Sequence, residues 1–267
     1  MNTLRALIVL LVAVFSPALV AAEEGSAPAG DAYVPTVLVT GSNKGIGLEF
    51  VRQYAARGAR VIATARNPGD AADLNALAAA NPRVIVEPLD VTDHAAIDAL
   101  AAKYAGTAID LLINNAGISG GSENQVFGKM KYAAFEDVLR VNTIGPLKMA
   151  EAFMPHVQAS RDKRIVAVSS SEGSIGKVNS ARLYFYRTSK AALNMEMKVL
   201  AYQVKSKGVS IGLVNPGMVD TDLMKGLPKS ILRPPADAVR DMIRNIDTLT
   251  VANTASYWDH DGTILPW

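Results

Sequence analysis

The chain has 267 residues, of which 49% are hydrophobic, and this is enough for a sizeable core in one large domain or two small ones. Its 27 basic and 25 acidic residues leave a net charge of +2, without the basic excess that nucleic-acid binding requires, so no nucleic acid is expected as a partner. The absence of cysteine excludes disulfides, thiolate zinc sites and cysteine nucleophiles, and His94, His156 and His260 are too scattered to predict a metal site.

The first 22 residues have the pattern of a secretory signal. One cation, Arg5, precedes an unbroken apolar run from Ala6 to Phe15, and a stretch of small residues ends at Ala22. The run is shorter than the roughly 18 residues expected of a membrane-spanning helix. We therefore predict a signal peptide over 1–22 and an exported or membrane-associated protein.

Two alternatives to cleavage stay open. The segment 4–22 could be retained as a membrane anchor, or residues 1–22 could be absent from the natural product, which would then be cytoplasmic. In each case we expect a polar linker over 23–34 and a globular domain over 35–267.

Short apolar segments alternate with helical ones from Pro35 onward. The predicted strands are 36–40, 60–65, 84–91, 110–117, 164–170 and 209–217. The predicted helices are 48–58, 73–80, 93–104 with Thr92 as N-cap, 132–158 and a helix that carries 183–194. This alternation predicts an α/β fold, a single doubly wound Rossmann-type domain whose mostly parallel sheet has helices on both faces.

The remaining C-terminal stretch shows weaker patterns. The segment from Met218 to Thr250 has the composition of a surface insertion, with a helix after Pro234-Pro235.

A glycine cluster, "TGSNKGIG", lies between the first strand and the first helix. Gly41, Gly45 and Gly47 permit a sharp turn and let a pyrophosphate approach the backbone, and the helix N-terminus supplies free N–H groups. The spacing departs from G-x-G-x-x-G, and an ordinary turn is the alternative. Its place in the first strand-to-helix turn favours a dinucleotide site.

The end of the second strand, "VIATARNP", indicates which dinucleotide is bound. An acidic residue there would hold a ribose 2′-hydroxyl, but this stretch has none and carries Arg66 instead. Lys44 adds a second cation beside the glycine cluster, and the two together suit a 2′-phosphate. We predict NADP(H); the alternative is two solvated surface cations.

A tyrosine and a lysine lie one helical turn apart in "LYFYRTSKAALN". Tyr186 faces Lys190, whereas Tyr184 faces only Thr188. A nearby ammonium group favours the phenolate, so we expect the pKa of Tyr186 to be lowered and Tyr186 to be the candidate acid/base. The alternative is a half-buried ring beside a solvated charge.

Several segments together resemble the short-chain dehydrogenase/reductase family. The resemblance covers about 36–221 and rests on "TGSNKGIG", "LDV", "NNAG", "VNTIGP", "SSSEG", "YRTSK" and "NPGMVDTD", which occur in the order of the family. "TARNP", "VNTIGP", "YRTSK" and the ending "DGTILPW" are most similar to the branch with Sniffer-type carbonyl reductases and bacterial C-signal proteins.

The resemblance implies four catalytic residues. Tyr186 would donate or accept the proton, and Lys190 would lower its pKa and bind the nicotinamide ribose. The family serine stands three residues before a glycine, which selects Ser170 among the three serines of "SSSEG". Asn142 would hold a water that leads from the lysine to solvent, although a purely structural hydrogen bond is an equal alternative.

The resemblance also implies a set of cofactor-binding residues. Asp90 would contact the adenine, with Val91 beside it, and Pro216, Gly217 and Thr221 would lie against the nicotinamide. The full predicted set is Gly41, Ser42, Asn43, Lys44, Gly45, Ile46, Gly47, Arg66, Asp90, Val91, Asn114, Ala116, Gly117, Lys190, Pro216, Gly217, Val219 and Thr221.

These features predict an NADPH-dependent oxidoreductase that acts on a small-molecule carbonyl or secondary alcohol in an apolar pocket. The alternative is a signalling or sensor protein on the same scaffold. The resemblance further implies a homodimer or homotetramer formed through two long helices. The stretch with Met195, Met197, Leu200 and Tyr202 could serve that contact or face the core, and we favour the core.

Overall fold

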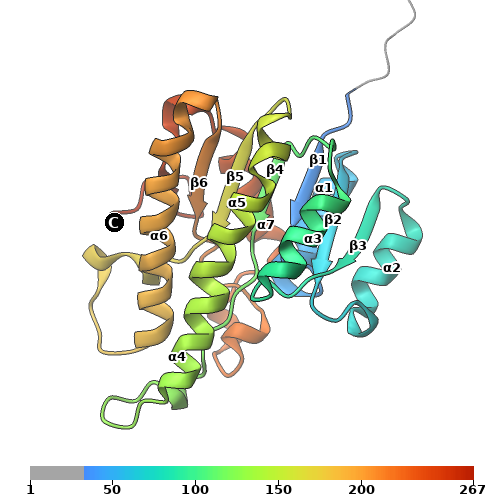
Figure 1. The fold of residues 1–267 in the computed structure, drawn as a ribbon. Helices are drawn as coiled ribbons and strands as arrows, with labels where there is room; N and C mark the ends of the chain where they lie inside the picture. The colour runs from blue at the N-terminus through green and yellow to red at the C-terminus, as the bar shows by residue number, and fades with distance from the viewer. Residues whose placement is uncertain (1–32) are drawn as a thin grey trace, which may run out of the picture. The chain divides into compact units, whose positions relative to one another are not determined.

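Seven strands form one sheet in the order β3-β2-β1-β4-β5-β6-β7, and every neighbouring pair is parallel (Figure 1). The structure is a computed structural model that describes residues 33–267. The strands are β1 (Thr36–Val39), β2 (Arg60–Ala65), β3 (Val84–Pro88), β4 (Leu111–Asn114), β5 (Arg164–Val168), β6 (Ser210–Val214) and β7 (Ser256–Trp258). The predicted α/β fold is confirmed, and β7 is a strand that we did not predict. The predicted signal over 1–22 lies outside the described residues.

Helices cover both faces of the sheet. They are α1 (Gly45–Ala56), α2 (Ala72–Ala80), α3 (His94–Lys103), α4 (Tyr132–Leu139), α5 (Gly145–Gln158), α6 (Tyr184–Val204) and α7 (Pro235–Asp247). One core cluster joins the sheet to α1, α2 and α7, and a second joins it to α3, α5 and α6. Strand residues alternate between the two clusters, as in β1, where Val37 and Val39 face one layer and Leu38 faces the other.

The segment 218–250 is not a surface insertion, because its helix belongs to a layer of the domain. Val239, Met242 and Ile246 of α7 are fully buried at the spacing of one helix face, and they pack into the same core cluster as α1. The helix predicted after Pro234-Pro235 is present and begins at Pro235. Polar residues on the opposite face of α7 give this stretch the composition of a surface element in the sequence.

The N-cap of α3 is Asp93, not Thr92. The carboxylate of Asp93 accepts a hydrogen bond from the backbone N–H of Ala96 at 3.0 Å. Thr92 instead directs both its N–H and its hydroxyl to Asp90, at 2.9 and 2.7 Å. Competition from this carboxylate explains why the predicted cap fails.

The predicted helix over 132–158 is interrupted by a wide π-helical turn at Arg140–Ile144, between α4 and α5. Pro146 has no N–H for the usual bond to the carbonyl of Asn142, which favours a local change of helical pitch. π-helical turns of this kind occur frequently at functional sites. The turn carries Asn142, one of the predicted catalytic residues.

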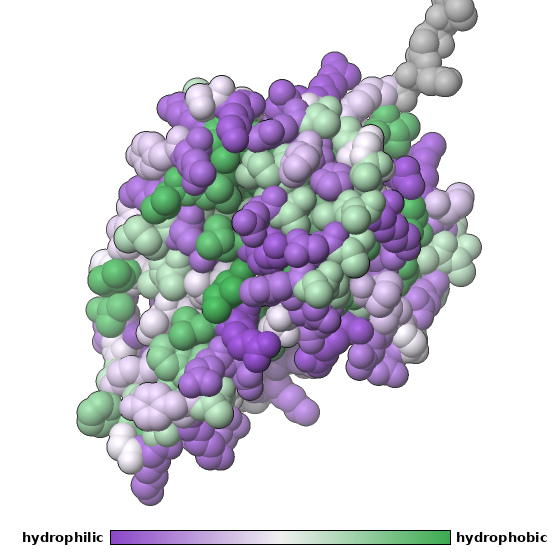
Figure 2. All heavy atoms as spheres, viewed as in Figure 1, coloured by the Kyte–Doolittle hydropathy of each residue, from purple (hydrophilic) through white to green (hydrophobic). Residues whose placement is uncertain are grey.

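The stretch from Met195 to Tyr202 on α6 is split between core and surface. Met197 is fully buried, but Met195 and Tyr202 are 65% and 70% exposed, so the preference for the core holds for only part of the stretch. Figure 2 shows apolar side chains distributed over the α5 and α6 side of the molecule. Within residues 33–267, no helix combines the length and the apolar composition needed to cross a membrane.

Candidate active site

A cleft of about 1000 Å³ opens at the carboxyl ends of the strands, where the sheet order reverses between β1 and β4. The turn after β1, the loops after β2 to β6 and the first turns of α6 contribute to it. Of the predicted site residues, those that line it are Gly41, Asn43, Lys44, Gly45, Ile46, Gly47, Arg66, Asp90, Val91, Ala116, Gly117, Ser170, Tyr186, Lys190, Pro216, Gly217, Val219 and Thr221. Ser42, Asn114 and Asn142 do not line the cleft.

The glycine turn is built around contacts that exclude side chains. A Cβ on Gly47 would lie 2.1 Å from the carbonyl oxygen of Gly41, and one on Gly41 would lie 2.9 Å from the Cα of Ala116. Gly41 and Gly45 also have φ values of +65° and +57°, which only glycine adopts readily. The chain therefore passes close under the first turn of α1, whose N–H groups point into the cleft and can bind a phosphate.

Asn115 ties this turn to β4 and was absent from the predicted set. Its Nδ2 donates to the carbonyl oxygens of Thr40 and Gly41 at 2.9 and 3.1 Å. The hydroxyl of Thr40 in turn accepts from the N–H groups of Asn115 and Ala116 at 3.0 and 3.1 Å. The doubled asparagine of "NNAG" was the available signal, but the sequence does not tell which amide side chain faces the cleft.

Ser42 and Asn114 point into the protein instead of the cleft. Ser42 is fully buried, and its hydroxyl donates to the carbonyl oxygen of Val39 at 2.9 Å. Asn114 donates to the carbonyl oxygen of Pro146 at the start of α5, at 3.3 Å. Both residues therefore support the site from behind, since side-chain directions alternate along the chain as β1 and β4 end.

Two cations, Arg66 and Lys44, lie at the cofactor end of the cleft. Arg66 follows β2 and is exposed, with Asn67 and Asp70 beside it on the wall of the cleft. Lys44 forms an ion pair with Asp222, which lies across the mouth of the cleft in the segment after β6. Both side chains of this pair are largely exposed, so the pair is weak and can exchange for another anion.

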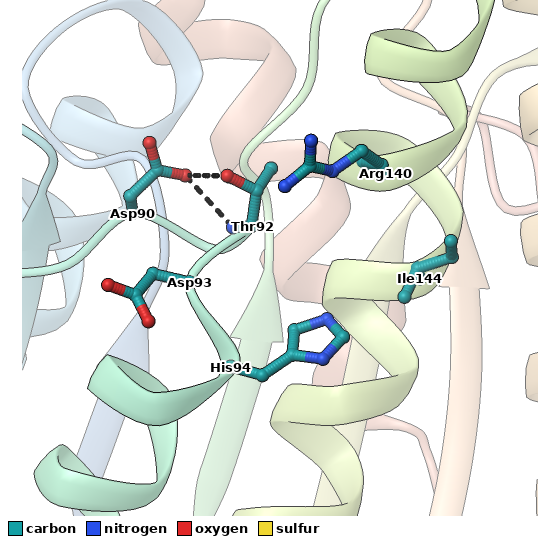
Figure 3. A pocket seen from close by; sticks show the side chains of 6 residues that line it. All are labelled: Asp90, Thr92, Asp93, His94, Arg140 and Ile144. Atoms are coloured by element: carbon teal, nitrogen blue, oxygen red, sulfur yellow. Dashed lines mark hydrogen bonds between the residues drawn. The ribbon is translucent and has the colours of Figure 1, made fainter.

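Asp90 lies where the cleft meets a second hollow of about 560 Å³, lined also by Thr92, Asp93, His94, Arg140 and Ile144 (Figure 3). Burial disfavours the charged form of Asp90. The hydrogen bonds from Thr92 and the nearby Arg66 and Arg140 outweigh this effect and lower the pKa of Asp90 below its usual value. Asp90 is thus a fixed carboxylate acceptor at one end of the cleft.

Tyr186 and Lys190 are both buried in the floor of the cleft, in the first two turns of α6. The Lys190 ammonium donates to the carbonyl oxygen of Val168 at 2.8 Å and lies 5.8 Å from the centroid of the Tyr186 ring. Tyr184 is outside the cleft, 38% exposed, with its ring 6.2 Å from that of Phe127. The helical spacing therefore selects the tyrosine that reaches the cleft.

The expected fall in the pKa of Tyr186 is wrong for this structure. Burial raises the pKa of Tyr186 to about 12; a hydrogen bond with Ser170 acts in the lowering direction, and Glu172 raises the pKa further. Burial also lowers the pKa of Lys190 to about 8. The charge of the lysine alone would favour the phenolate, but the removal of both groups from water is the larger effect here.

The structure separates the three serines of "SSSEG". The Ser169 hydroxyl donates to Asn194 Oδ1 at 2.6 Å. Ser171 lies in a short helical turn. Ser169 and Ser170 both line the cleft, and of the two it is the Ser170 hydroxyl that is hydrogen-bonded to Tyr186. The two side chains together present hydroxyl groups to one point of the cleft.

Asn142 is fully buried beneath the cleft, in the π-helical turn. Its Oδ1 accepts from the N–H of Ile118 at 2.9 Å, and its Nδ2 donates to the carbonyl oxygen of the same residue at 2.8 Å. Nδ2 also contacts the Ser189 hydroxyl at 3.0 Å. The side chain therefore holds the segment after "NNAG", which matches the structural alternative for this residue.

No group of three or more metal-ligating side chains occurs among residues 33–267. The polar side chains of the cleft are instead hydroxyl, amide, ammonium, guanidinium and carboxylate groups, and they lie beside the glycine turn. Such a set fits a dinucleotide and a neutral polar reactant.

Comparison with known proteins assigns the chain to a family. The model of the family described as "short chain dehydrogenase" matches residues 35–231. The chain belongs to the short-chain dehydrogenase family. As a member, it is an oxidoreductase by descent, and the resemblance seen in its motifs is confirmed.

This short-chain dehydrogenase is similar to three named proteins, among others. A 1-hydroxy-2-glutathionyl-2-methyl-3-butene dehydrogenase of Rhodococcus sp. (strain AD45) is 37% identical over 236 residues, 87% of this chain and 99% of the relative. The C-signal protein of Myxococcus xanthus is 35% identical over 63% of this chain and 99% of its own. The NADPH-bound carbonyl reductase from chicken fatty liver has a TM-score of 0.81 and 31% identity, over 88% of this chain and all of that one.

The contact between Gly47 and Gly41 predicts a defined effect of Gly47→Ala. The added methyl group cannot fit 2.1 Å from a carbonyl oxygen, so the turn must move, and affinity for NADPH should fall by about tenfold or more. Fluorescence titration with NADPH measures the loss.

Gly69→Ala is the matched control, because a Cβ there meets no atom within 4 Å. Since alanine is a better helix former than glycine, Gly47→Ala cannot lose affinity through helix propensity. Equal NADPH affinity in the Gly47→Ala variant and the unmodified protein would contradict the role given to the turn.

Proposed function

We propose that the chain binds NADP(H) and reduces an aldehyde, ketone or quinone-like carbonyl, or oxidises the corresponding secondary alcohol. The observation that carries this proposal is the pair of hydroxyl groups of Tyr186 and Ser170, hydrogen-bonded to each other inside the cleft that contains the glycine turn. Two hydroxyl groups that converge in a cofactor cleft can hold one carbonyl oxygen and protonate it. The relationship to an NADPH-bound carbonyl reductase supports the same reaction.

The residues of the chain divide the chemistry between them. Bound NADPH supplies the hydride. Tyr186, with a pKa of about 12, is protonated at neutral pH and donates its proton to the carbonyl oxygen during reduction. Ser170 donates a hydrogen bond to the same oxygen. Lys190 supplies positive charge beneath the site, and Asn142 fixes the wall at Ile118.

Arg66 supports a preference for NADP(H) over NAD(H). It stands at the end of β2, where an acidic residue would otherwise favour a free 2′-hydroxyl, and its guanidinium is exposed on the wall of the cleft. Lys44 can add a second cation, although Asp222 competes for it. A phosphate with two negative charges is the stronger partner for both groups.

The substrate end of the cleft favours a neutral, apolar carbonyl compound. Apolar side chains that line the cleft include Ile118, Val141, Val168, Leu223 and Met224. Apolar walls with few polar groups are typical of small-molecule pockets, in which the polar groups fix the orientation of the ligand.

A sensor or signalling role is the second candidate function, and the relationship to a C-signal protein favours it. In that role, binding of NADP(H) would change a surface without turning over a substrate. Turnover of any carbonyl that depends on Tyr186 separates the two candidates.

We also propose that the segment 1–22 directs export or anchors the protein at a membrane, because Ala6 to Phe15 is uninterrupted and apolar. A homodimer or homotetramer is proposed as well, through α5 and α6, where Leu147, Met195 and Val199 are exposed.

Tyr186→Phe tests the proposed reaction. The variant keeps the ring and loses the proton donor, so kcat for carbonyl reduction should fall by about 100-fold or more while NADPH affinity stays unchanged. NADPH oxidation in the presence of a panel of aldehydes and ketones measures kcat. Tyr184→Phe, two residues away and outside the cleft, is the control and should retain full activity. Undiminished turnover in Tyr186→Phe would exclude the proposed role.

Arg66→Ala tests the cofactor preference. Loss of a charge-assisted contact to the 2′-phosphate should weaken NADPH binding by about 10- to 100-fold and leave NADH binding nearly unchanged. The dissociation constants of both cofactors give the ratio. Arg60→Ala, at the opposite end of β2, is the control. An equal loss of affinity for NADPH and NADH would show that Arg66 does not distinguish the 2′-phosphate.

A further inference from the structure

One peptide group next to the cleft, between Ser170 and Ser171, is held from both sides. The carbonyl oxygen of Ser170 accepts a hydrogen bond from the hydroxyl of Tyr257. The N–H of Ser171 donates to Asn215 Oδ1 at 3.0 Å. Tyr257 lies in β7 and Asn215 directly follows β6, so two different strands fix the same peptide plane.

This peptide plane determines where the Ser170 hydroxyl lies. Ser170 has an extended backbone, with φ of −159° and ψ of 146°, and rotation of the following peptide changes ψ. The Ser170 hydroxyl oxygen accepts from the N–H of Glu172 at 3.2 Å, so the serine side chain and the next two peptides move together. Holding the peptide therefore holds the hydroxyl that contacts Tyr186.

Tyr257 is itself rigidly held. Its side chain is 1% exposed, and its ring stacks on that of Trp267 with centroids 5.4 Å apart. Lys198 Nζ lies 4.2 Å from the centroid of the Trp267 ring on the α6 side, where Figure 1 marks the C-terminal end. Burial raises the pKa of Tyr257 to about 12, so its hydroxyl is a hydrogen-bond donor at neutral pH.

The segment after β7 is hydrogen-bonded to the loop that follows Ser170. The Ser174 hydroxyl donates to the carbonyl oxygen of Pro266 at 2.6 Å. The N–H of Gly176 donates to the carbonyl oxygen of Trp267 at 2.9 Å. On the other side, Asn215 Nδ2 donates to Asp259 Oδ1 at 2.7 Å. The segment 256–267 thus supplies Tyr257 and also holds Asn215, so it supports both hydrogen bonds to the peptide between Ser170 and Ser171.

We propose that Tyr257 is a positioning residue for the reaction, acting through the backbone of Ser170. The inference rests on the proposed function, since it assigns a role to the serine of the same site. A buried tyrosine usually finds some hydrogen-bond partner. Here the partners are the side chains of Ser169 and Asn194 and the carbonyl group of Ser170, the residue that contacts Tyr186. The side chain thereby couples the 256–267 segment to the reacting centre without touching the substrate.

Tyr257→Phe tests the proposal, because it keeps the ring stack and removes only the hydroxyl. We expect kcat to fall about tenfold, with KM for the carbonyl and NADPH affinity nearly unchanged. Tyr54→Phe is the matched control, because Tyr54 is also buried but its hydroxyl has no hydrogen-bond partner. The control should retain full kcat.

A double-mutant cycle with Ser170→Ala separates positioning from general structural damage. If Tyr257 acts through Ser170, Tyr257→Phe should cause no further loss of kcat in the Ser170→Ala background. An equal loss in both backgrounds, or no loss in either, would overturn the inference. Absence of turnover in the unmodified protein would instead overturn the proposed function and the inference with it.

Discussion

The close approach of Gly47 to the carbonyl oxygen of Gly41 is the constraint on which the cleft depends. It lets α1 begin directly above the end of β1, so that the first N–H groups of the helix point into the space where the sheet order reverses. Asn115 then joins this turn to β4 through two carbonyl oxygens, one of them that of Gly41. A side chain at either glycine would displace this turn, because the added Cβ would lie less than 3 Å from the backbone of Gly41 or Ala116.

Burial is the second physical factor that shapes the site. Loss of water is the largest effect on the pKa values of Tyr186 and Lys190, which it raises to about 12 and lowers to about 8. At neutral pH the tyrosine is therefore protonated, and most of the lysine still carries its charge. A protonated tyrosine suits a proton donor, so this electrostatic arrangement is compatible with carbonyl reduction. The Ser170 hydroxyl is the neighbour that opposes the rise in the pKa of Tyr186, which makes the position of that hydroxyl important for the chemistry.

Much of the fold and of the site was predictable from the sequence because the relevant patterns are local. Strand and helix alternation predicted the parallel sheet, and helical spacing selected Tyr186 over Tyr184. Features set by distant contacts were not predictable: α7 packs with α1, and the side chains of Ser42 and Asn114 turn inward. The same holds for the pKa of Tyr186, which depends on burial by several segments, and for the contact of Tyr257 with Ser170, residues 87 positions apart.

The central claim is that this cleft transfers hydride from NADPH to a carbonyl carbon. The most direct measurement uses NADPH with deuterium at both C4 positions, incubated with the full-length protein and the carbonyl compounds. Mass spectrometry of the products then locates the label. Our account predicts an alcohol with one deuterium on the former carbonyl carbon. Tight NADPH binding without a labelled alcohol from any carbonyl would contradict the claim and favour the sensor role.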